Sequence, residues 1–365
     1  MPSALFSPIR INTVELVNRL VVAPMCQYSA ADGSATDWHL QHLAQLGYSG
    51  AGLIMVEATG VERRGRITHG CLGLYSEENE AALGRVLAAA RRLAGPARFG
   101  IQLAHAGRKA STLPPWQGGK PLRESQDPWT TVAPSALAFD EGWHVPTALT
   151  VEGLKSITAS FVLAAQRAAR LGFDVIELHS AHGYLIHEFL SPLSNQRTDH
   201  YGGSLENRMR FGLETLAAIR GVLPESMALG MRISSTDWVE GGWSIDDSIE
   251  YVRAAQRIGV DYVCASSGGN RLVQVPNVPG YQVQFAQQIR QATGVITRAV
   301  GLITDPMQAE QILANGQADL IALARAFLDD PRWGWHAADR LGAAVHCPAP
   351  YARVRIPDWL KIKNR

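Results

Sequence analysis

Short β-branched apolar runs and longer stretches of helical periodicity alternate along this chain. The run over residues 173–178 is typical of a buried parallel strand, because it is short, apolar and rich in β-branched residues. After the capping residue Thr150, by contrast, Leu154, Ile157 and Phe161 recur on one helical face. The strand pattern predicts strands over residues 20–23, 52–58, 99–103, 173–178, 227–233, 261–265, 295–300 and 320–324.

Helical patterns fill the intervals between these strands and follow the last one. They cover residues 36–47, 76–93, 150–171, 204–222, 244–258, 281–292, 305–314 and 327–341. Eight strands alternating with eight helices is the pattern of a (β/α)8 TIM barrel, an α/β fold. The alternative is an open doubly wound sheet, but no Gly-x-Gly-x-x-Gly motif follows the first strand, so a dinucleotide fingerprint is missing.

Two segments fall outside the alternation. Periodicity disappears over residues 110–148, where prolines and glycines recur, and loops of this length are usually lids or binding loops. The tail over residues 343–365 contains three prolines, which exclude a regular helix, and has aromatic and arginine residues suited to an interface. We therefore expect one domain over residues 1–365, with a capping loop after the third strand and a tail at a subunit interface.

Composition narrows the class of protein. A 365-residue chain with 46% hydrophobic residues can bury the core of a single large barrel. The near balance of 34 basic and 33 acidic residues, without a basic block, excludes a nucleic-acid footprint and favours a small-molecule substrate. Four dispersed cysteines without a Cys-x-x-Cys pair, and no signal-peptide or membrane-spanning run, predict a soluble cytoplasmic protein with reduced thiols.

The candidate chemistry lies just past the strand ends. His179, His182 and Tyr184 follow the fourth strand, and the carboxyl ends of strands are where this fold collects its active-site groups. Imidazole and phenol groups donate hydrogen bonds to a ligand oxygen, and a phenol can deliver a proton. The other strand ends supply Cys26 and Tyr28, Ala58, Gln102, Arg232, Gly301, and Ala324 with Arg325.

Three interpretations of these residues remain open on the pattern alone. Arginine, glutamine and backbone amides near the last two strands suit an anionic cofactor, because phosphate sites in this fold commonly lie there. The two histidines would instead suit a metal-dependent barrel hydrolase, although the other strand ends offer no third ligand and an arginine is unfavourable beside a cation. Arg232 is alternatively a structural ion-pair partner of Glu177 or Asp237.

Four ordered stretches of the chain resemble the old yellow enzyme family of FMN-dependent ene-reductases, in its thermophilic-like or xenobiotic-reductase branch. The resemblance runs from Leu5 into the tail, and four motifs in the same order are very specific. The stretches are residues 18–28, 102–109, 177–185 and 194–208.

The resemblance implies bound FMN, with NADPH or NADH as hydride donor. FMN would pass hydride from its N5 atom to the activated C=C bond of an enone, enal, maleimide or related nitro compound. His179 and His182 would bind the substrate carbonyl, Tyr184 would supply the proton, and Tyr28 would add a hydrogen bond. The implied cofactor contacts are Pro24, Met25, Cys26, Ala58, Gln102, Arg232, Val300, Gly301, Ala324 and Arg325.

The chain departs from the usual sequence of the branch at one position, and its alignment with the branch is loose in the tail. Ala324 stands where the family more often has glycine, which places a methyl group near the expected phosphate. The branch often inserts a tail residue into the neighbouring subunit's pocket, so Arg355 or Trp359 is a candidate substrate contact. This arrangement implies a homodimer or a tetramer.

Overall fold

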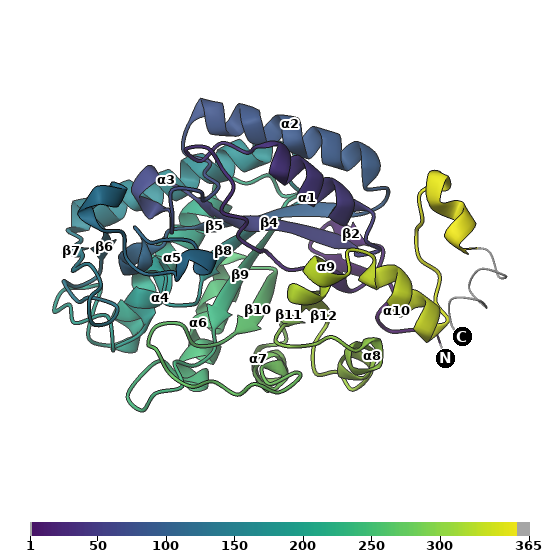
Figure 1. Ribbon diagram of the computed structural model, residues 1–365. Coiled ribbons are helices and arrows are strands. Elements are labelled where there is room, and N and C mark those ends of the chain that lie inside the picture. The colour runs from purple at the N-terminus through teal and green to yellow at the C-terminus, as the bar shows by residue number, and fades with distance from the viewer. Residues whose placement is uncertain (1, 356–365) are drawn as a thin grey trace.

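Eight parallel strands close into a barrel in the computed structural model, which describes residues 2–355 (Figure 1). The strands follow one another around the barrel in the order β3, β4, β5, β8, β9, β10, β11, β12, with β12 pairing back to β3. The predicted (β/α)8 fold is therefore confirmed. The strand bounds are β3 Leu20–Val22, β4 Leu53–Gly60, β5 Arg98–Ala104, β8 Val175–Ser180, β9 Ala228–Ser234, β10 Tyr262–Ser266, β11 Ile296–Ala299 and β12 Leu320–Leu323.

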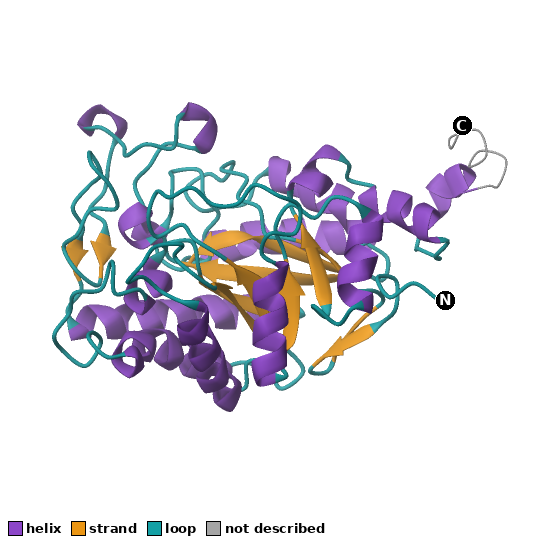
Figure 2. Cartoon of the chain, turned by 90° about the horizontal axis from the view of Figure 1, so that it is seen from below, coloured by secondary structure: helices purple, strands orange, loops and turns teal. Residues whose placement is uncertain are grey.

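Helices surround the barrel, as Figure 2 shows. The expected cap at Thr150 forms, because its hydroxyl accepts a hydrogen bond from the Gly153 amide, and the Ser76 hydroxyl caps α2 in the same way by accepting one from the Asn79 amide. The helices are α1 Asp37–Gly47, α2 Glu77–Leu93, α3 Val151–Arg170, α4 Leu185–Leu190, α5 Leu205–Arg220, α6 Ile245–Ile258, α7 Val283–Thr293, α8 Pro306–Ala314, α9 Arg325–Asp329 and α10 Trp333–Leu341.

The expected single final helix over residues 327–341 is wrong. The chain forms α9 and α10 instead, and the break falls at Pro331. Proline lacks the amide hydrogen that an interior helical position needs, and its ring clashes with the preceding turn. α9 is therefore a separate short helix. It begins at Arg325, directly after the eighth strand and beside the candidate site.

An N-terminal hairpin closes the amino end of the barrel, and the sequence patterns did not predict it. Its strands are β1 Ile9–Ile11 and β2 Val14–Leu16, which pair antiparallel. Ile11 and Leu16 are fully buried in one cluster with the first residues of several barrel strands, among them Leu53 and Val175. This end of the barrel is thus filled by apolar side chains, and the opposite, carboxyl end carries the open loops.

The long segment over residues 110–148 is largely irregular, as its composition predicts. It contains the 3-10 turns η3 Pro115–Gln117 and η4 Glu124–Gln126, and its end pairs with itself through β6 Val132–Ala133 and β7 Thr147–Ala148. Arg197 ties both of these strands to the loop after β8, because its Nη1 donates to Pro134 O at 3.0 Å and Leu149 O at 2.5 Å.

The described part of the tail forms the 3-10 helix η5 Ala349–Arg355, which lies beyond α10 at one side of the barrel (Figure 1). Tyr351 stacks on Tyr48 with ring centroids 5.7 Å apart, and Arg355 Nη1 lies 2.5 Å from Asp339 Oδ1. Trp359 lies outside the described residues.

A polar cluster centred on Glu177 lies inside the barrel. The fully buried carboxylate of Glu177 accepts hydrogen bonds from Gln102 Nε2 at 2.7 Å, from the Tyr262 hydroxyl at 2.8 Å and from the Arg298 guanidinium. These four residues stand on β5, β8, β10 and β11. A buried charge is tolerated only when it is paired and fully hydrogen-bonded, and this cluster meets that condition at Glu177.

The cluster also overturns one interpretation from the sequence. Glu177 pairs with Arg298, and Asp237 pairs with His187, whose Nε2 lies 3.1 Å from Asp237 Oδ1. The suggestion that Arg232 pairs with either carboxylate is therefore wrong. Spacing along the chain does not reveal which strands face one another across a barrel.

Arg298→Met is expected to lower the free energy of unfolding by about 3–5 kcal/mol, because it leaves the Glu177 carboxylate buried without its cation. Urea denaturation of the variant measures this loss, with the exposed Arg257→Met as the matched control. The double variant Glu177→Gln with Arg298→Met should recover part of the stability. A double variant that loses the sum of the two single effects would show that the pair is not coupled.

Candidate functional site

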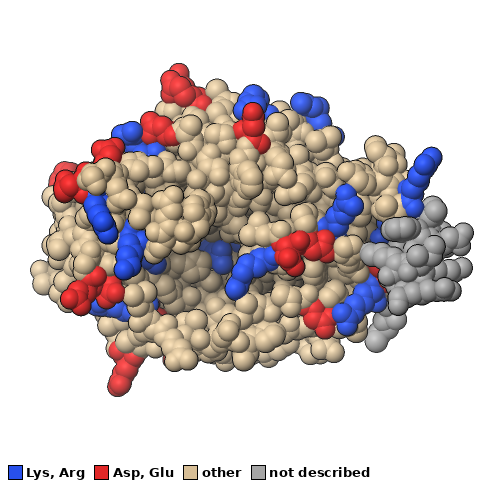
Figure 3. Space-filling model, in the orientation of Figure 1, with Lys and Arg blue, Asp and Glu red and all other residues tan. Residues whose placement is uncertain are grey.

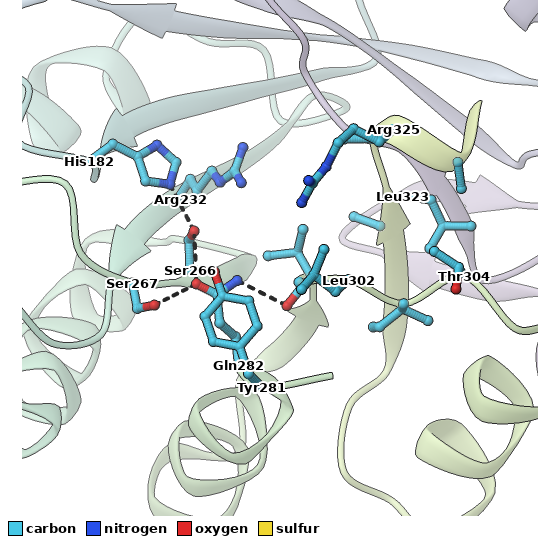
Figure 4. Close-up of a pocket in the computed structure, with 16 residues that line it drawn as sticks. His182, Arg232, Ser266, Ser267, Tyr281, Gln282, Leu302, Thr304, Leu323 and Arg325 are labelled. Atoms are coloured by element: carbon cyan, nitrogen blue, oxygen red, sulfur yellow. Dashed lines mark hydrogen bonds between the residues drawn. The ribbon is translucent and has the colours of Figure 1, made fainter. Parts of the chain in front are cut away.

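A cavity of about 300 Å³ opens among the loops that follow the barrel strands at their carboxyl ends (Figure 4). Figure 4 shows Arg232 and Arg325 extending toward the same space from opposite sides. Figure 3 shows a hollow near the centre of one face of the molecule, with Lys or Arg atoms inside it. The candidate site residues that line the cavity are His182, Arg232, Val300, Gly301, Ala324 and Arg325.

Several lining residues were missed by the sequence analysis. Ser266 ends β10, and Ser267, Tyr281 and Gln282 follow it. Ser267 Oγ donates to Gln282 Oε1 at 2.6 Å, and Gln282 Nε2 donates to Val300 O at 3.1 Å. The available signal was position alone, since these hydroxyl and amide groups follow the sixth strand as the other candidates follow theirs.

Gly301 brings bare backbone to the cavity wall. Its φ is +120°, and a Cβ atom there would lie 2.7 Å from Gln282 Nε2, so no other residue fits without displacement. Ala324, the departure from the family pattern, has a φ of −109°, which any residue can adopt. The extra methyl group therefore introduces no strain through this angle.

The two candidate histidines contact each other, and their contacts define their tautomers. The Ala181 amide donates to His179 Nδ1 at 3.2 Å, so a neutral His179 carries its hydrogen on Nε2. That nitrogen lies 3.2 Å from His182 Nδ1, and His182 Nε2 lies 2.8 Å from Ser266 Oγ. The hydrogen bonds therefore run in one direction, from the Ala181 amide through both imidazoles to Ser266.

Electrostatics keep both imidazoles neutral. Burial, and after it the positive charge of Arg232, lowers the pKa of His179 and His182 well below the ordinary value of 6.5. Arg232 stands directly opposite His179 in the β8·β9 register. The pair therefore donates hydrogen bonds without being charged itself.

Tyr184 lies beside the histidines at the start of α4. Its ring centroid is 4.9 Å from that of His179, and burial raises the pKa of its phenol above the ordinary value of 10. It also lines a second, small cavity of about 10 Å³ together with Ala58 and Cys71. The phenol thus keeps its proton at neutral pH.

Cys26 and Tyr28 lie in the loop after β3. Burial, and then the Glu57 carboxylate, raises the pKa of the Cys26 thiol, so it is not an activated thiolate. The Tyr28 ring meets Trp116 edge-on, with centroids 5.6 Å apart. Because Trp116 belongs to the 110–148 segment, that segment reaches this edge of the site.

Arg232 on β9 and Gln102 on β5 are both strand residues, but their side chains have different hydrogen-bond partners. Arg232 Nε is buried without a hydrogen-bond partner, and no carboxylate among residues 2–355 forms an ion pair with this guanidinium. Gln102 lies opposite Ala58 across β4 and β5, with its amide bonded to Glu177 instead of lining the cavity. Pro24 and Met25 follow β3 with Cys26, and none of the three lines the 300 Å³ cavity.

These groups fit an anionic, phosphate-bearing cofactor. Two arginines face the cavity, one of them with an unpartnered buried nitrogen, and Gly301 leaves backbone accessible in the loop after the seventh strand. Within residues 2–355, no three His, Cys, Asp or Glu side chains cluster as metal ligands would.

Three similar hydrogen-bonded groups, which we call braces, each join a backbone amide, a histidine and a carboxylate near the loops of the site. In each brace a backbone amide donates to histidine Nδ1, while Nε2 faces a carboxylate that fixes the tautomer. The braces are Thr36 amide, His39 and Glu57; Gly107 amide, His105 and Glu62; and Gly183 amide, His187 and Asp237. The last one holds the turn between His182 and Tyr184.

Comparison with known proteins gives a consistent family. The model of the family described as "NADH:flavin oxidoreductase / NADH oxidase family" matches residues 4–342 of this chain. The chain is 42% identical over 353 residues to the NADPH dehydrogenase of Listeria innocua, covering 96% of this chain and 99% of that protein. It is also 42% identical over 355 residues to the NADPH dehydrogenase of Geobacillus thermodenitrificans, covering 97% and 99%.

Solved structures agree on the architecture. Morphinone reductase superposes with a TM-score of 0.77 at 29% identity, covering 96% of this chain and 92% of that one. A 2-naphthoyl-CoA reductase superposes with a TM-score of 0.83 at 24% identity, which shows the fold alone, and this chain spans 52% of its length. Among residues 2–355, no helix has the length and apolar character needed to cross a bilayer.

The His187 brace predicts a pH-dependent contribution to stability. Burial alone would raise the pKa of Asp237, but the contacts with His187, Ser191 and Trp243 hold it at about 2, below the ordinary 3.8. A depressed carboxyl pKa stabilises the fold above the unfolded value, and this contribution is lost as pH falls from about 4 through about 2.

Asp237→Asn should therefore lower the free energy of unfolding most above pH 4, and the difference from wild type should shrink by about 2 kcal/mol toward pH 2. Urea titrations across this pH range measure the difference. A gap that stays constant at every pH would mean that the Asp237 charge contributes nothing.

Proposed function

We propose that this chain, which belongs to the NADH:flavin oxidoreductase / NADH oxidase family, reduces the activated C=C bond of α,β-unsaturated carbonyl compounds. As in its family, FMN is the cofactor and NADPH or NADH is the reductant. The observation that carries the proposal is a neutral imidazole pair, in which His182 lines the arginine-lined cavity and His179 lies beside the buried, protonated phenol of Tyr184.

The cavity residues would hold the cofactor. Arg232 and Arg325 would pair with its anionic parts, and Gly301 would bring backbone amides close to the phosphate. Bound FMN would supply the hydride-transfer chemistry between the nicotinamide and the C=C bond of the substrate. The remaining proposed contacts are Pro24, Met25, Cys26, Ala58, Gln102, Val300 and Ala324.

The histidines would orient and polarise the substrate. His179 Nε2–H is now donated to His182, and His182 Nε2–H faces Ser266, so both donors lie where a carbonyl oxygen can replace a weak partner. Negative charge grows on that oxygen during reduction, and two preorganised donors stabilise it. Their neutrality keeps them as hydrogen-bond donors without competing for the proton that Tyr184 delivers.

Tyr184 would protonate the substrate α-carbon. Its raised pKa means that it holds the proton until an acceptor as basic as an enolate carbon forms. Tyr28 would add a hydrogen bond from the loop after β3, where its ring meets Trp116 of the 110–148 segment. We propose that this segment caps the substrate side of the site.

The proposal extends to assembly. The whole chain would act as one FMN-binding unit, in a cytoplasmic homodimer or tetramer whose interface includes the tail. Arg355 is ion-paired with Asp339 of its own chain and does not line the cavity described above. Any substrate contact by Arg355 would therefore be made in a neighbouring subunit, and we propose Trp359 as a second candidate for that contact.

Anaerobic turnover of 2-cyclohexenone with NADPH tests the function. The purified flavoprotein should oxidise NADPH in proportion to the enone added and release cyclohexanone. A protein that binds FMN and is reduced by NADPH, yet leaves cyclohexenone, cinnamaldehyde and N-methylmaleimide unchanged, would contradict the proposal and leave the family assignment intact.

Tyr184→Phe should slow reoxidation of the reduced enzyme by cyclohexenone by roughly 100-fold or more, because the proton donor is lost. Reduction of the bound flavin by NADPH should stay near the wild-type rate. Stopped-flow absorbance separates the two half-reactions, and Tyr201→Phe, whose hydroxyl contacts Glu214 outside the cavity, is the matched control. Equal losses in both half-reactions would count against the proton-donor role.

A further inference from the structure

Two consecutive basic residues after β5 hold together the loops that follow β8 and β10. Arg108 is fully buried, and its Nη2 donates to Asn270 O and Asn270 Oδ1, both at 2.9 Å. Lys109 Nζ donates to His182 O at 2.7 Å and to Gly269 O at 2.8 Å. Both residues stand in the 3-10 turn η2 Gly107–Lys109, which follows β5. Their side chains therefore connect this turn to the loops after β8 and β10.

The two bridged loops touch backbone to backbone. A Cβ atom on Gly183 would lie 2.3 Å from Gly269 O, and a Cβ on Gly269 would lie 2.6 Å from His182 Cα. His182 itself has a φ of +61°, a conformation that non-glycine residues seldom adopt. Close contact between two carbonyl-rich loops is unfavourable without a shared donor, and the Lys109 ammonium supplies donors to both.

The same ammonium also faces the proposed proton donor. Lys109 Nζ lies 5.2 Å from the centroid of the Tyr184 ring and 4.7 Å from that of Phe139, both within cation–π range. Lys109 therefore contacts the peptide of one proposed substrate-binding residue and the ring of the proposed acid. Phe139 comes from the 110–148 segment and encloses the ammonium from the other side.

We propose that Lys109 is a positioning residue for the oxidative half-reaction, which sets the Tyr184 ring relative to the substrate while its bonds to His182 O and Gly269 O hold the ammonium in place. The inference rests on the proposed function. Lys109 does not line the 300 Å³ cavity, so its effect passes through Tyr184. Misplacing a proton donor by an ångström is enough to cost about 100-fold in rate.

The charge needed for this role is present at neutral pH. Burial lowers the pKa of Lys109 to about 8, while Glu188 raises it and Arg108 lowers it further. Glu188 is itself buried, and burial raises its pKa to about 8. The other titratable groups that face the ammonium are Tyr184, His179 and His182, whose imidazoles stay neutral.

A double-mutant cycle in the FMN-loaded enzyme tests the proposal. Lys109→Met keeps the aliphatic stem and removes the ammonium, and it should slow the limiting rate of reoxidation by cyclohexenone by roughly 10- to 100-fold. The apparent binding constant for the enone and the rate of flavin reduction by NADPH should change little. In the Tyr184→Phe background the same substitution should cost less than about twofold, because the residue that it positions no longer donates a proton.

Controls separate this role from general structural support. Lys155→Met, on the exposed side of α3, should match wild type in both half-reactions. Lys109→Ala should regain part of its reoxidation rate when ethylammonium is added, since the cation can re-enter the vacated space. If Lys109→Met does not yield folded flavoprotein, Lys109→Gln, which keeps an NH₂ donor for the carbonyls, takes its place in the cycle.

The outcomes are distinguishable from failure of the proposed function. A wild-type enzyme that does not reduce cyclohexenone would overturn the proposed function itself. An active wild type that is slowed by Tyr184→Phe, but is unaffected by Lys109→Met, would overturn only the role of Lys109. Equal losses from Lys109→Met in the presence and absence of the Tyr184 hydroxyl would also overturn it.

Discussion

The buried carboxylate of Glu177 constrains the centre of the barrel. It accepts hydrogen bonds from residues on β5 and β10 and pairs with Arg298 on β11, so four strands converge on one charge. A carboxylate so far from water needs all of these partners at once. Two residues further along β8 stands His179, which contacts the cavity-lining His182, so the strand that satisfies the core also carries a proposed substrate-binding residue. The position of the site thus depends on a strand whose register the core cluster holds in place.

Above this cluster, the site is built from groups whose hydrogens have defined positions. Each brace uses a backbone amide to define a histidine tautomer, and the His179–His182 pair follows the same rule through Ala181. Such preorganisation matters because donors that must reorient during a reaction lose part of their effect. The side chains proposed to touch a ligand are consequently few, while many more residues hold them in place. Lys109 and His187 belong to this larger group.

The periodicity of apolar residues predicted much of the fold, and the positions of polar residues relative to strand ends predicted part of the site. All eight barrel strands were predicted because β-branched apolar runs are distinctive. His182, Arg232, Gly301 and Arg325 line the cavity, and the sequence singled them out because they lie near the end of such runs or just after them. Ser266 and Gln282 were missed because a hydroxyl at the end of a strand and an amide at the start of a helix carry no chemical signal of their own. The Glu177–Arg298 pair was missed because it joins strands that meet only across the barrel interior.

The seam between β3 and β12 joins the two ends of the barrel sequence. Val22 pairs with Leu323, and the Ile321 amide donates to Arg19 O, so the first strand finds its neighbour only after the last strand has emerged. During synthesis the N-terminal hairpin and β3 must wait with an unpaired edge, which is a template for wrong pairing. Contacts between such distant segments also slow closure, because the intervening loop must be ordered first. Closure of the ring therefore requires β12, and a chain cut short before β12 would leave β3 and β11 with unpaired strand edges.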